Sequence, residues 1–346
     1  MKLPLPARLG LPRAWKRPPA QPLRGAYQKN ERLAALQRLA AVPGTAGPES
    51  LAIGPDNSLY SGFDDGRIVR FDARGNMLKT LCNTGGRPLG LRFHPDGSLL
   101  VCDARRGLLR VLPEGQVRLV ADRAEGLRFG FADDLDVSAD GRYAYFSDAS
   151  SKWHYNEDHL DLLEHGGHGR LLRCDLETGE TSVLLRGLQF ANGVTLGPDD
   201  AYVLVTETGA YRVQRYWLKG ERAGTAEVWL DNLPGFPDNI RFNGRDRFWL
   251  AIPAPRNLLV DLAAPLPLLR FGMLQYARFL PMPVAHAGIV LGIDLEGRVV
   301  ANLQSHAPGA YAFITQVMEA GSWLYVSSLK EKTLARLPLA ALQVER

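Results

Sequence analysis

Short apolar runs alternate with turns along most of the chain, and one phrase of this pattern recurs. Each copy has a turn residue, a position of varying polarity, a small or polar residue, and then alternating apolar residues. After a turn, a second apolar run follows each copy, a third run follows most copies, and a fourth often closes the unit. Six copies begin at residues 48, 88, 132, 191, 237 and 314. Four short strands per unit, repeated six times with a period of about 40 residues, predict an all-β, six-bladed β-propeller with four-stranded blades.

Two intervals between copies are longer than the others, and both predict insertions into the propeller. The first insertion covers about residues 150–169 and includes a short helical pattern. The second covers about residues 253–286 and is rich in leucine and proline. Inserted loops of repeat proteins often shape the binding face. The second insertion is therefore either a lid over an apolar substrate or a helix packed on the rim.

Charge divides the chain into a basic arm and a slightly acidic body. Residues 1–32 hold eight Lys or Arg and one acid, a net charge of +7, so the rest of the chain carries −3 of the total +4. We expect residues 1–45 to form a basic, Pro-rich N-terminal arm and residues 46–346 to form the propeller. The arm is a weak contact for an anionic membrane surface, a strap over the domain, or a disordered end.

Several partner classes are not expected. The body has no aromatic–basic stripe and no nucleic-acid motif, so nucleic acid is not an expected partner. No run of 18 apolar residues is present, so no transmembrane segment is expected. The first residues lack a secretory hydrophobic core, which predicts a cytoplasmic protein.

The varying position of the repeat predicts a ring of side chains around the propeller axis, because the first strand of each blade lies next to the central channel. In chain order the ring reads Glu49, Leu89, Asp133, Asn192, Asp238 and Thr315. Carboxylate and amide oxygens suit Ca²⁺, whereas Zn²⁺ favours Cys and His. The sequence therefore predicts a metal site on the central axis. The alternative is that these residues cap backbone amides at turns and strand starts.

Two groups near the ring are further candidates. Asn239 follows Asp238 and adds another amide oxygen. His286 and His306 lie near blade ends that are expected to face the channel mouth, where either could act as a general base. No nucleophile-elbow motif and no phosphate-cradling loop occurs.

Several phrases of the chain resemble the strictosidine-synthase-like proteins. They are residues 131–137 followed by 146–153, residues 188–194, and residues 215–220 continued by 231–240. The resemblance covers about residues 20–346. It implies kinship with gluconolactonases, senescence-marker proteins and paraoxonases, which are six-bladed propellers with Ca²⁺ on the axis.

The resemblance also implies roles for single positions. The family's metal ligands fall on Glu49, Asn192, Asp238 and Asn239. The third-blade phrase of the family has asparagine where this chain has Asp133, so the role of that position is open. In the family's amine–aldehyde condensing enzyme, the catalytic glutamate lies in the sixth-blade phrase, and we align Thr315 with it. Threonine does not exchange a proton with an amine near neutral pH, which argues against that reaction.

These observations predict a Ca²⁺-dependent hydrolase of apolar lactones or small aryl esters, in which the metal polarises a carbonyl that is attacked by water or by a carboxylate such as Asp238. The predicted catalytic residues are Asp133, Asp238 and His286. The predicted substrate-binding residues are Asp133, Asn239, Leu89 and Thr315. The alternatives are a non-catalytic ligand-binding propeller and a carbon–nitrogen condensing enzyme, the latter disfavoured by Thr315.

Overall fold

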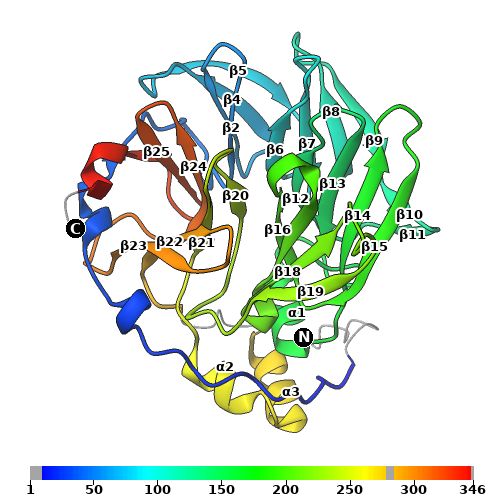
Figure 1. Ribbon diagram of the computed structural model, residues 1–346, viewed down its shortest axis with the longest axis vertical. Helices are drawn as coiled ribbons and strands as arrows, with labels where there is room; N and C mark the ends of the chain where they lie inside the picture. The colour runs from blue at the N-terminus through cyan, green and yellow to red at the C-terminus, as the bar shows by residue number, and fades with distance from the viewer. Residues whose placement is uncertain (1–9, 278–283, 344–346) are drawn as a thin grey trace, which may run out of the picture.

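Six four-stranded antiparallel sheets surround a central axis in the computed structural model, which describes residues 10–277 and 284–343 (Figure 1). The sequence prediction of an all-β, six-bladed propeller is confirmed. Residues 1–9 of the expected arm, 278–283 of the second insertion and 344–346 of the expected propeller lie outside the described residues.

The first five blades are consecutive in the chain, and in each the first strand is innermost. Blade 1 comprises β2 (Leu51–Ile53), β3 (Leu59–Gly62), β4 (Arg67–Phe71) and β5 (Met77–Asn83). Blade 2 comprises β6 (Pro88–Phe93), β7 (Leu99–Asp103), β8 (Gly107–Val111) and β9 (Val117–Ala121). Blade 3 comprises β12 (Ala132–Val137), β13 (Tyr143–Asp148), β14 (Gly169–Asp175) and β15 (Thr181–Leu188). Blade 4 comprises β16 (Ala191–Leu196), β17 (Tyr202–Glu207), β18 (Arg212–Trp217) and β19 (Ala226–Leu230). Blade 5 comprises β20 (Ile240–Phe242), β21 (Arg247–Ile252), β22 (Gly288–Asp294) and β23 (Val299–Ser305).

The sixth blade joins the two ends of the chain. It comprises β24 (Ile314–Ala320), β25 (Trp323–Ser328), β26 (Ala335–Pro338) and, outermost, β1 (Gln37–Arg38). β1 pairs with β26, and in this pairing Gln37 lies opposite Arg336. The N-terminal strand covers an edge that would otherwise expose unpaired backbone groups. Residues 37–38, which fall within the expected arm of residues 1–45, thus complete the sixth blade.

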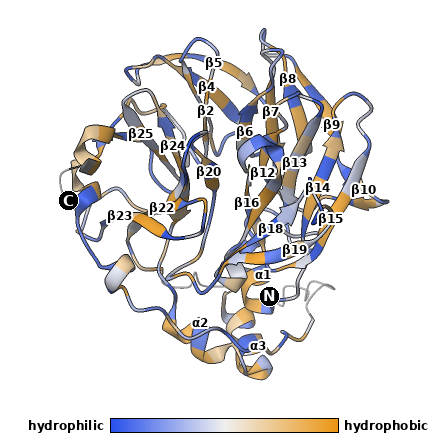
Figure 2. Cartoon of the chain, in the orientation of Figure 1, coloured by the Kyte–Doolittle hydropathy of each residue, from blue (hydrophilic) through white to orange (hydrophobic). Residues whose placement is uncertain are grey.

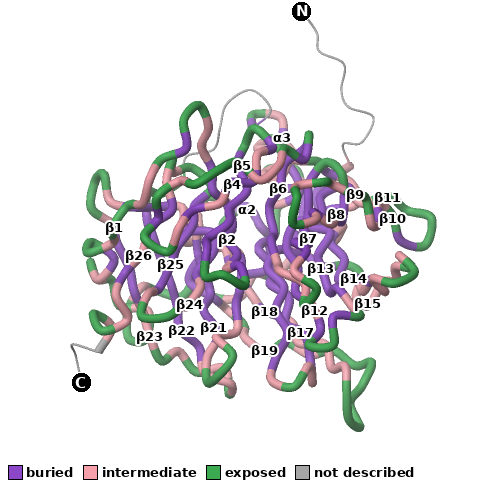
Figure 3. The backbone as a smooth tube through the Cα atoms, turned by 90° about the horizontal axis from the view of Figure 1, so that it is seen from above, coloured by how far each residue is buried: buried purple, intermediate pink, exposed green. Residues whose placement is uncertain are grey.

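The core lies between neighbouring blades. All residues of the second strands β7 and β17 are buried, because these strands are covered on both faces by adjacent sheets. Most residues of the outer strands β5 and β9 are partly or fully exposed. Figure 3 shows this gradient, with the buried backbone concentrated around the inner strands. The inner strands are therefore the most constrained part of the fold.

Both insertions contain helices. The first carries α1 (Asp158–Glu164), and the second carries α2 (Leu258–Ala263) and α3 (Pro267–Ala277). The helices α1 and α3 pack together through Trp153, Leu160, Leu163, Leu274 and Ala277. The smaller elements are a ribbon of β10 (Arg123–Ala124) and β11 (Leu127–Arg128) and the short helices η1 (Gly25–Tyr27), η2 (Arg32–Ala35), η3 (Pro198–Asp200), η4 (Thr208–Ala210) and η5 (Leu339–Gln343). No helix in the described ranges is both long and apolar enough to cross a membrane.

The described part of the N-terminal arm is a strap that crosses the inserted helices and then packs against β23 of the fifth blade (Figure 1). The N–H of Trp15 donates to the carbonyl of Ala264 at 3.1 Å, and the Trp15 ring stacks on His165 with 4.1 Å between ring centroids. Arg17 Nε donates to the carbonyl of Asp261 at 2.8 Å. Of the three interpretations of the arm, the strap thus describes residues 10–36.

Candidate functional site

All six side chains of the predicted ring line a single cavity of about 610 Å³. They come from the starts of the six innermost strands or from the residue pairs just before them. The cavity also receives residues from both insertions, among them Leu162, Leu258 and Val260. The repeat therefore brings residues that are far apart in the sequence to one polar floor, and the insertions supply the walls.

β-Bulges at the ring position direct consecutive side chains to different environments. The strand register shifts between Ala132 and Leu135 and again between Ala191 and Val194, so two residues oppose one on the neighbouring strand. A bulge re-aims side chains at functional sites. Asp133 accordingly lines the cavity, whereas Asp134 makes an ion pair with Arg241 of the fifth blade.

Three buried oxygen atoms around the floor accept no hydrogen bond within the described part of the chain. They are Glu49 Oε2, Asn192 Oδ1 and Asn239 Oδ1. Asn239 does not line the cavity; its Nδ2 donates to Glu49 Oε1 at 2.8 Å. Buried polar atoms without partners are uncommon in proteins, and each requires an explanation. All three are oxygen acceptors of the kind that coordinates Ca²⁺, so the residues present fit a hard cation.

The donor set mixes carboxylates with amides. Over residues 10–277 and 284–343, no three His, Cys, Asp or Glu side chains are grouped as in a metal site. A cation held here would thus take oxygens from Glu49 and Asp238 together with Asn192. That mixed oxygen set again matches Ca²⁺ and not Zn²⁺.

The carboxylates of the ring oppose one another's ionisation. Burial raises the pKa of Glu49 to about 7, partly offset by the Arg87 guanidinium, and the Asp134 charge adds to the rise. Burial and repulsion from Glu49 raise the pKa of Asp133 and of Asp238 well above their usual range. Like charges that share a desolvated site disfavour each other's charged form. A bound cation would remove this conflict.

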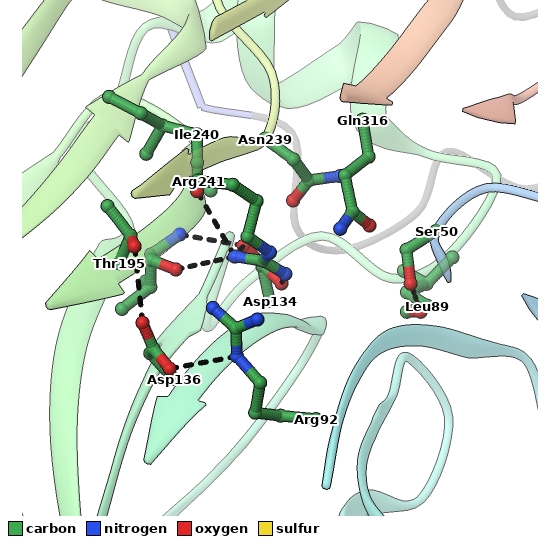
Figure 4. Close-up of polar contacts among 12 residues, drawn as sticks. Ser50, Leu89, Arg92, Asp134, Asp136, Thr195, Asn239, Ile240, Arg241 and Gln316 are labelled. Atoms are coloured by element: carbon green, nitrogen blue, oxygen red, sulfur yellow. Dashed lines mark hydrogen bonds and ion pairs between the residues drawn. The ribbon is translucent and has the colours of Figure 1, made fainter. Parts of the chain in front are cut away.

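A network of buried charges supports the floor (Figure 4). Arg241 binds both carboxylate oxygens of Asp134, and its Nη1 also donates to the carbonyl of Val194 at 2.7 Å. The N–H of Val194 donates to Asp134 Oδ2 at 2.8 Å. Arg92 forms an ion pair of 2.8 Å with Asp136, next to the Asp134–Arg241 pair. These bonds connect the second, third, fourth and fifth blades behind the ring.

The walls of the cavity are largely apolar and include several aromatic rings. Leu89, Phe131 and Phe190 belong to one buried cluster, and the rings of Phe131 and Phe190 meet edge to face with 5.5 Å between centroids. Phe190 and Phe313 line the cavity with φ of 57° and 53°. A bulky residue in the left-handed region is strained, and such strain persists where the surroundings impose it. The predicted apolar wall at Leu89 is thus continuous with these rings.

Two histidine candidates do not join the ring. His286 is exposed and does not line the cavity; its ring packs edge-on against Phe313 with 5.6 Å between centroids. His306 Nε2 lies 2.7 Å from Gln304 Oε1 and is also absent from the lining. His159 and Asp158 of α1 do line it. The repeat gave no signal for them, because they lie in an insertion.

Comparisons with protein families place the chain among strictosidine-synthase-related proteins. Residues 133–221 match the family model described as strictosidine synthase, and residues 25–71 match the model described as strictosidine synthase-like, N-terminal. Protein strictosidine synthase-like 6 of Arabidopsis thaliana is 37% identical over 84% of this chain and 79% of its own length. The adipocyte plasma membrane-associated protein of Danio rerio is 34% identical over 91% of this chain and 81% of its own length.

Solved structures share the fold at low sequence identity. A gluconolactonase of Xanthomonas campestris superposes with a TM-score of 0.61 and 18% identity, over 90% of this chain and 93% of that chain. The calcium-binding protein regucalcin of Agrobacterium tumefaciens superposes with a TM-score of 0.61 and 16% identity, over 88% and 93% of the two chains. These similarities support the propeller fold.

The Arg241–Asp134 pair makes the first testable prediction. Arg241→Met should lower the free energy of unfolding by about 3–5 kcal/mol, because it leaves the Asp134 charge buried and uncompensated. Urea unfolding followed by circular dichroism measures this change. Adding Asp134→Asn to the same chain should recover part of the loss. A loss below about 1 kcal/mol, as for an exposed pair, would contradict a structural role for this ion pair.

Proposed function

The chain belongs to the strictosidine synthase-like family, and from that premise we propose that it hydrolyses small apolar lactones or aryl esters with the help of Ca²⁺. One observation carries the proposal. Glu49 Oε2 and Asn192 Oδ1, from residues that line an apolar cavity, and Asn239 Oδ1 beside them are buried and accept no hydrogen bond from the described residues. Ligand pockets commonly combine apolar walls with a few convergent polar groups. The gluconolactonase and regucalcin that share the fold agree with this assignment.

In this proposal Glu49, Asn192 and Asp238 hold the cation, and Asn239 keeps the Glu49 carboxylate in place through the 2.8 Å bond. The bound cation supplies positive charge that polarises a carbonyl group and stabilises the oxyanion that develops on it. The chain's own residues must then bind the substrate, position a water molecule and take up its proton.

Asp133 is the proposed proton acceptor. It lines the cavity, and no hydrogen bond to its carboxylate occurs within the described ranges. One oxygen of Asp238, by contrast, already accepts from the N–H of Asn239 at 2.9 Å. An Asp133 oxygen can therefore take the proton of an attacking water, while Phe131 and Phe190 hold the apolar part of the substrate and exclude bulk water.

The condensing-enzyme alternative has less support from the site. Thr315 takes the place of that enzyme's glutamate, and its hydroxyl donates to the carbonyl of Glu49. The hydroxyl is thus engaged with the backbone and does not provide an acid or base. The other alternative is a propeller that binds a ligand without turnover, and only an activity measurement distinguishes it from a hydrolase.

Removal of metal tests the proposed function directly. The purified protein, stripped with a chelator, should lose hydrolysis of a panel of aryl esters and lactones and regain it when Ca²⁺ is restored. Circular dichroism of the stripped protein controls for unfolding. Absence of turnover across the panel in the presence of Ca²⁺ would falsify the hydrolase assignment and leave the binding propeller.

Substitution of the two aspartates separates proton transfer from metal binding. Asp133→Asn should reduce kcat by about 10²-fold or more, the scale of general-base catalysis, while calorimetry still detects Ca²⁺ binding. Asp238→Asn should lose both, because the ring then has one carboxylate fewer for the cation. Wild-type turnover in Asp133→Asn would show that another group accepts the proton.

We further propose that the second insertion contacts an anionic membrane surface, a role that extends the one considered for the arm. Six leucines of this segment are between 50% and 78% exposed, namely Leu258, Leu259, Leu262, Leu266, Leu268 and Leu269. Its acid Asp261 is buried, and the adjacent strap exposes Arg13 and Lys16. Figure 2 shows the apolar character of α2 and α3 at the edge of the molecule. Apolar helices beside basic residues favour the interface of anionic bilayers, and several relatives are named plasma membrane-associated proteins.

Vesicle sedimentation tests this contact. The full chain should sediment with phosphatidylcholine vesicles that contain phosphatidylserine, and high salt should weaken the binding. Leu262→Glu combined with Leu268→Glu should abolish it. Leu119→Glu is the matched control, because Leu119 is 54% exposed on the outer strand β9. Equal loss in the control, or a wild-type protein that stays in the supernatant, would contradict the proposal.

A further inference from the structure

One position of the second strand carries a hydroxyl in some blades and not in others, and its presence correlates with the ring residue of the next blade. In each blade, the first apolar residue after the ring position pairs with a residue of the second strand, and the position in question is the one that follows this partner. In the second blade, for example, Leu91 pairs with Val101, and Cys102 comes next. In blade order the position holds Gly62, Cys102, Ser147, Thr206, Ala251 and Ser327. Three blades therefore have a hydroxyl there and three do not.

Each of the three hydroxyls bonds to the backbone of the next blade. Ser147 Oγ donates to the carbonyl of Asn192 at 2.5 Å. Thr206 Oγ1 donates to the carbonyl of Asp238 at 2.8 Å. Ser327 Oγ donates to the carbonyl of Glu49 at 2.6 Å, which joins the last blade to the first. All three hydroxyl residues are fully buried.

The acceptors are the three residues proposed to hold the cation. The remaining ring residues are Leu89, Asp133 and Thr315, and the blades that precede them carry Gly62, Cys102 and Ala251 at this position. A side chain at Gly62 has no room, because a Cβ there would lie 2.7 Å from the carbonyl oxygen of Pro88. At this position of the second strand, hydroxyls thus occur only where the following ring residue is a proposed ligand. The carbonyl of Leu89 instead accepts from the hydroxyl of Ser50, which directly precedes the first strand of its blade, and the carbonyl of Glu49 also accepts from Thr315.

Two of the three hydroxyls also accept a hydrogen bond from a backbone N–H of their own blade. The N–H of Asp134 donates to Ser147 Oγ at 3.1 Å, and the N–H of Gly193 donates to Thr206 Oγ1 at 2.8 Å. Each of these two hydroxyls therefore relays a bond from the bulge of its own blade to the ring residue of the next. A carbonyl fixed in this way fixes the Cα of the same residue and the direction in which its side chain leaves the strand.

We infer that Ser147, Thr206 and Ser327 are positioning residues that orient Asn192, Asp238 and Glu49 toward a divalent cation, an inference that rests on the proposed function. Groups outside the ligand set that orient the ligands commonly account for a large part of metal affinity. The pattern also separates these three residues from Asp133, whose carbonyl receives no such bond within the described part of the chain.

Calorimetric titration of Ca²⁺ into the full-length, metal-stripped protein tests the inference. Ser147→Ala, Thr206→Val and Ser327→Ala should each weaken Ca²⁺ binding by about 10–100-fold, the range seen when such supporting groups are removed. Thr206→Ser keeps the hydroxyl and should bind as the wild type does. Cys102→Ala is the matched control, because it changes the same position in the blade that precedes Asp133.

The outcomes are distinct. Wild-type Ca²⁺ affinity in the three hydroxyl variants, with the native near-ultraviolet circular dichroism retained, would overturn the positioning role alone. An equal loss in Cys102→Ala would also overturn it, because the effect would then not depend on the hydroxyl. A wild-type protein that binds no divalent cation would overturn both this inference and the proposed function. If Ser147→Ala or Ser327→Ala does not fold, the comparison of Thr206→Ser with Thr206→Val still tests the presence and the absence of the hydroxyl at one site.

Discussion

Repulsion between carboxylates in a narrow, apolar cavity is the constraint on which the rest of this molecule depends. Glu49, Asp133 and Asp238 meet on one floor, and burial together with repulsion from neighbouring carboxylates raises the pKa of each. Arg87 and Arg241 are buried nearby and lower the pKa of Glu49. They do not pair with the unpartnered oxygens of the floor, so the site retains the capacity for a further positive charge.

The layer behind the ring shows how the backbone accommodates this arrangement. The residue directly after the ring position is small in three blades and a larger polar residue in the other three. The small residues are Ser50, Gly90 and Gly193, and the larger ones are Asp134, Asn239 and Gln316. A Cβ at Gly90 would lie 2.6 Å from the Cα of Asp134, and one at Gly193 would lie 2.5 Å from the Cα of Asn239. The missing side chains leave room for neighbouring strands to approach closely. Figure 4 shows four residues of this layer, Ser50, Asp134, Asn239 and Gln316.

Most of the fold and much of the site followed from the repeat. The blade pattern predicted which residues would share the cavity, since a fixed register places each ring residue at the same height on its innermost strand. The prediction was weaker wherever the repeat is interrupted. His286 ends the second insertion and is exposed, whereas Asp158 and His159 of the first insertion line the cavity. Asn239 was grouped with the ring from its place in the chain, yet its amide bonds to Glu49 behind the cavity surface.

The sequence by itself determined the six-bladed architecture and the identity of the ring, because both depend on a period that local apolar patterning and turns encode. Only the tertiary structure decided which oxygens lack a partner among the described residues, and which carbonyls receive a hydroxyl from the preceding blade. It also decided that the N-terminal strap crosses the inserted helices and that β1 completes the sixth blade. Those features arise from contacts between residues with no fixed separation in the chain, so no periodic pattern predicts them.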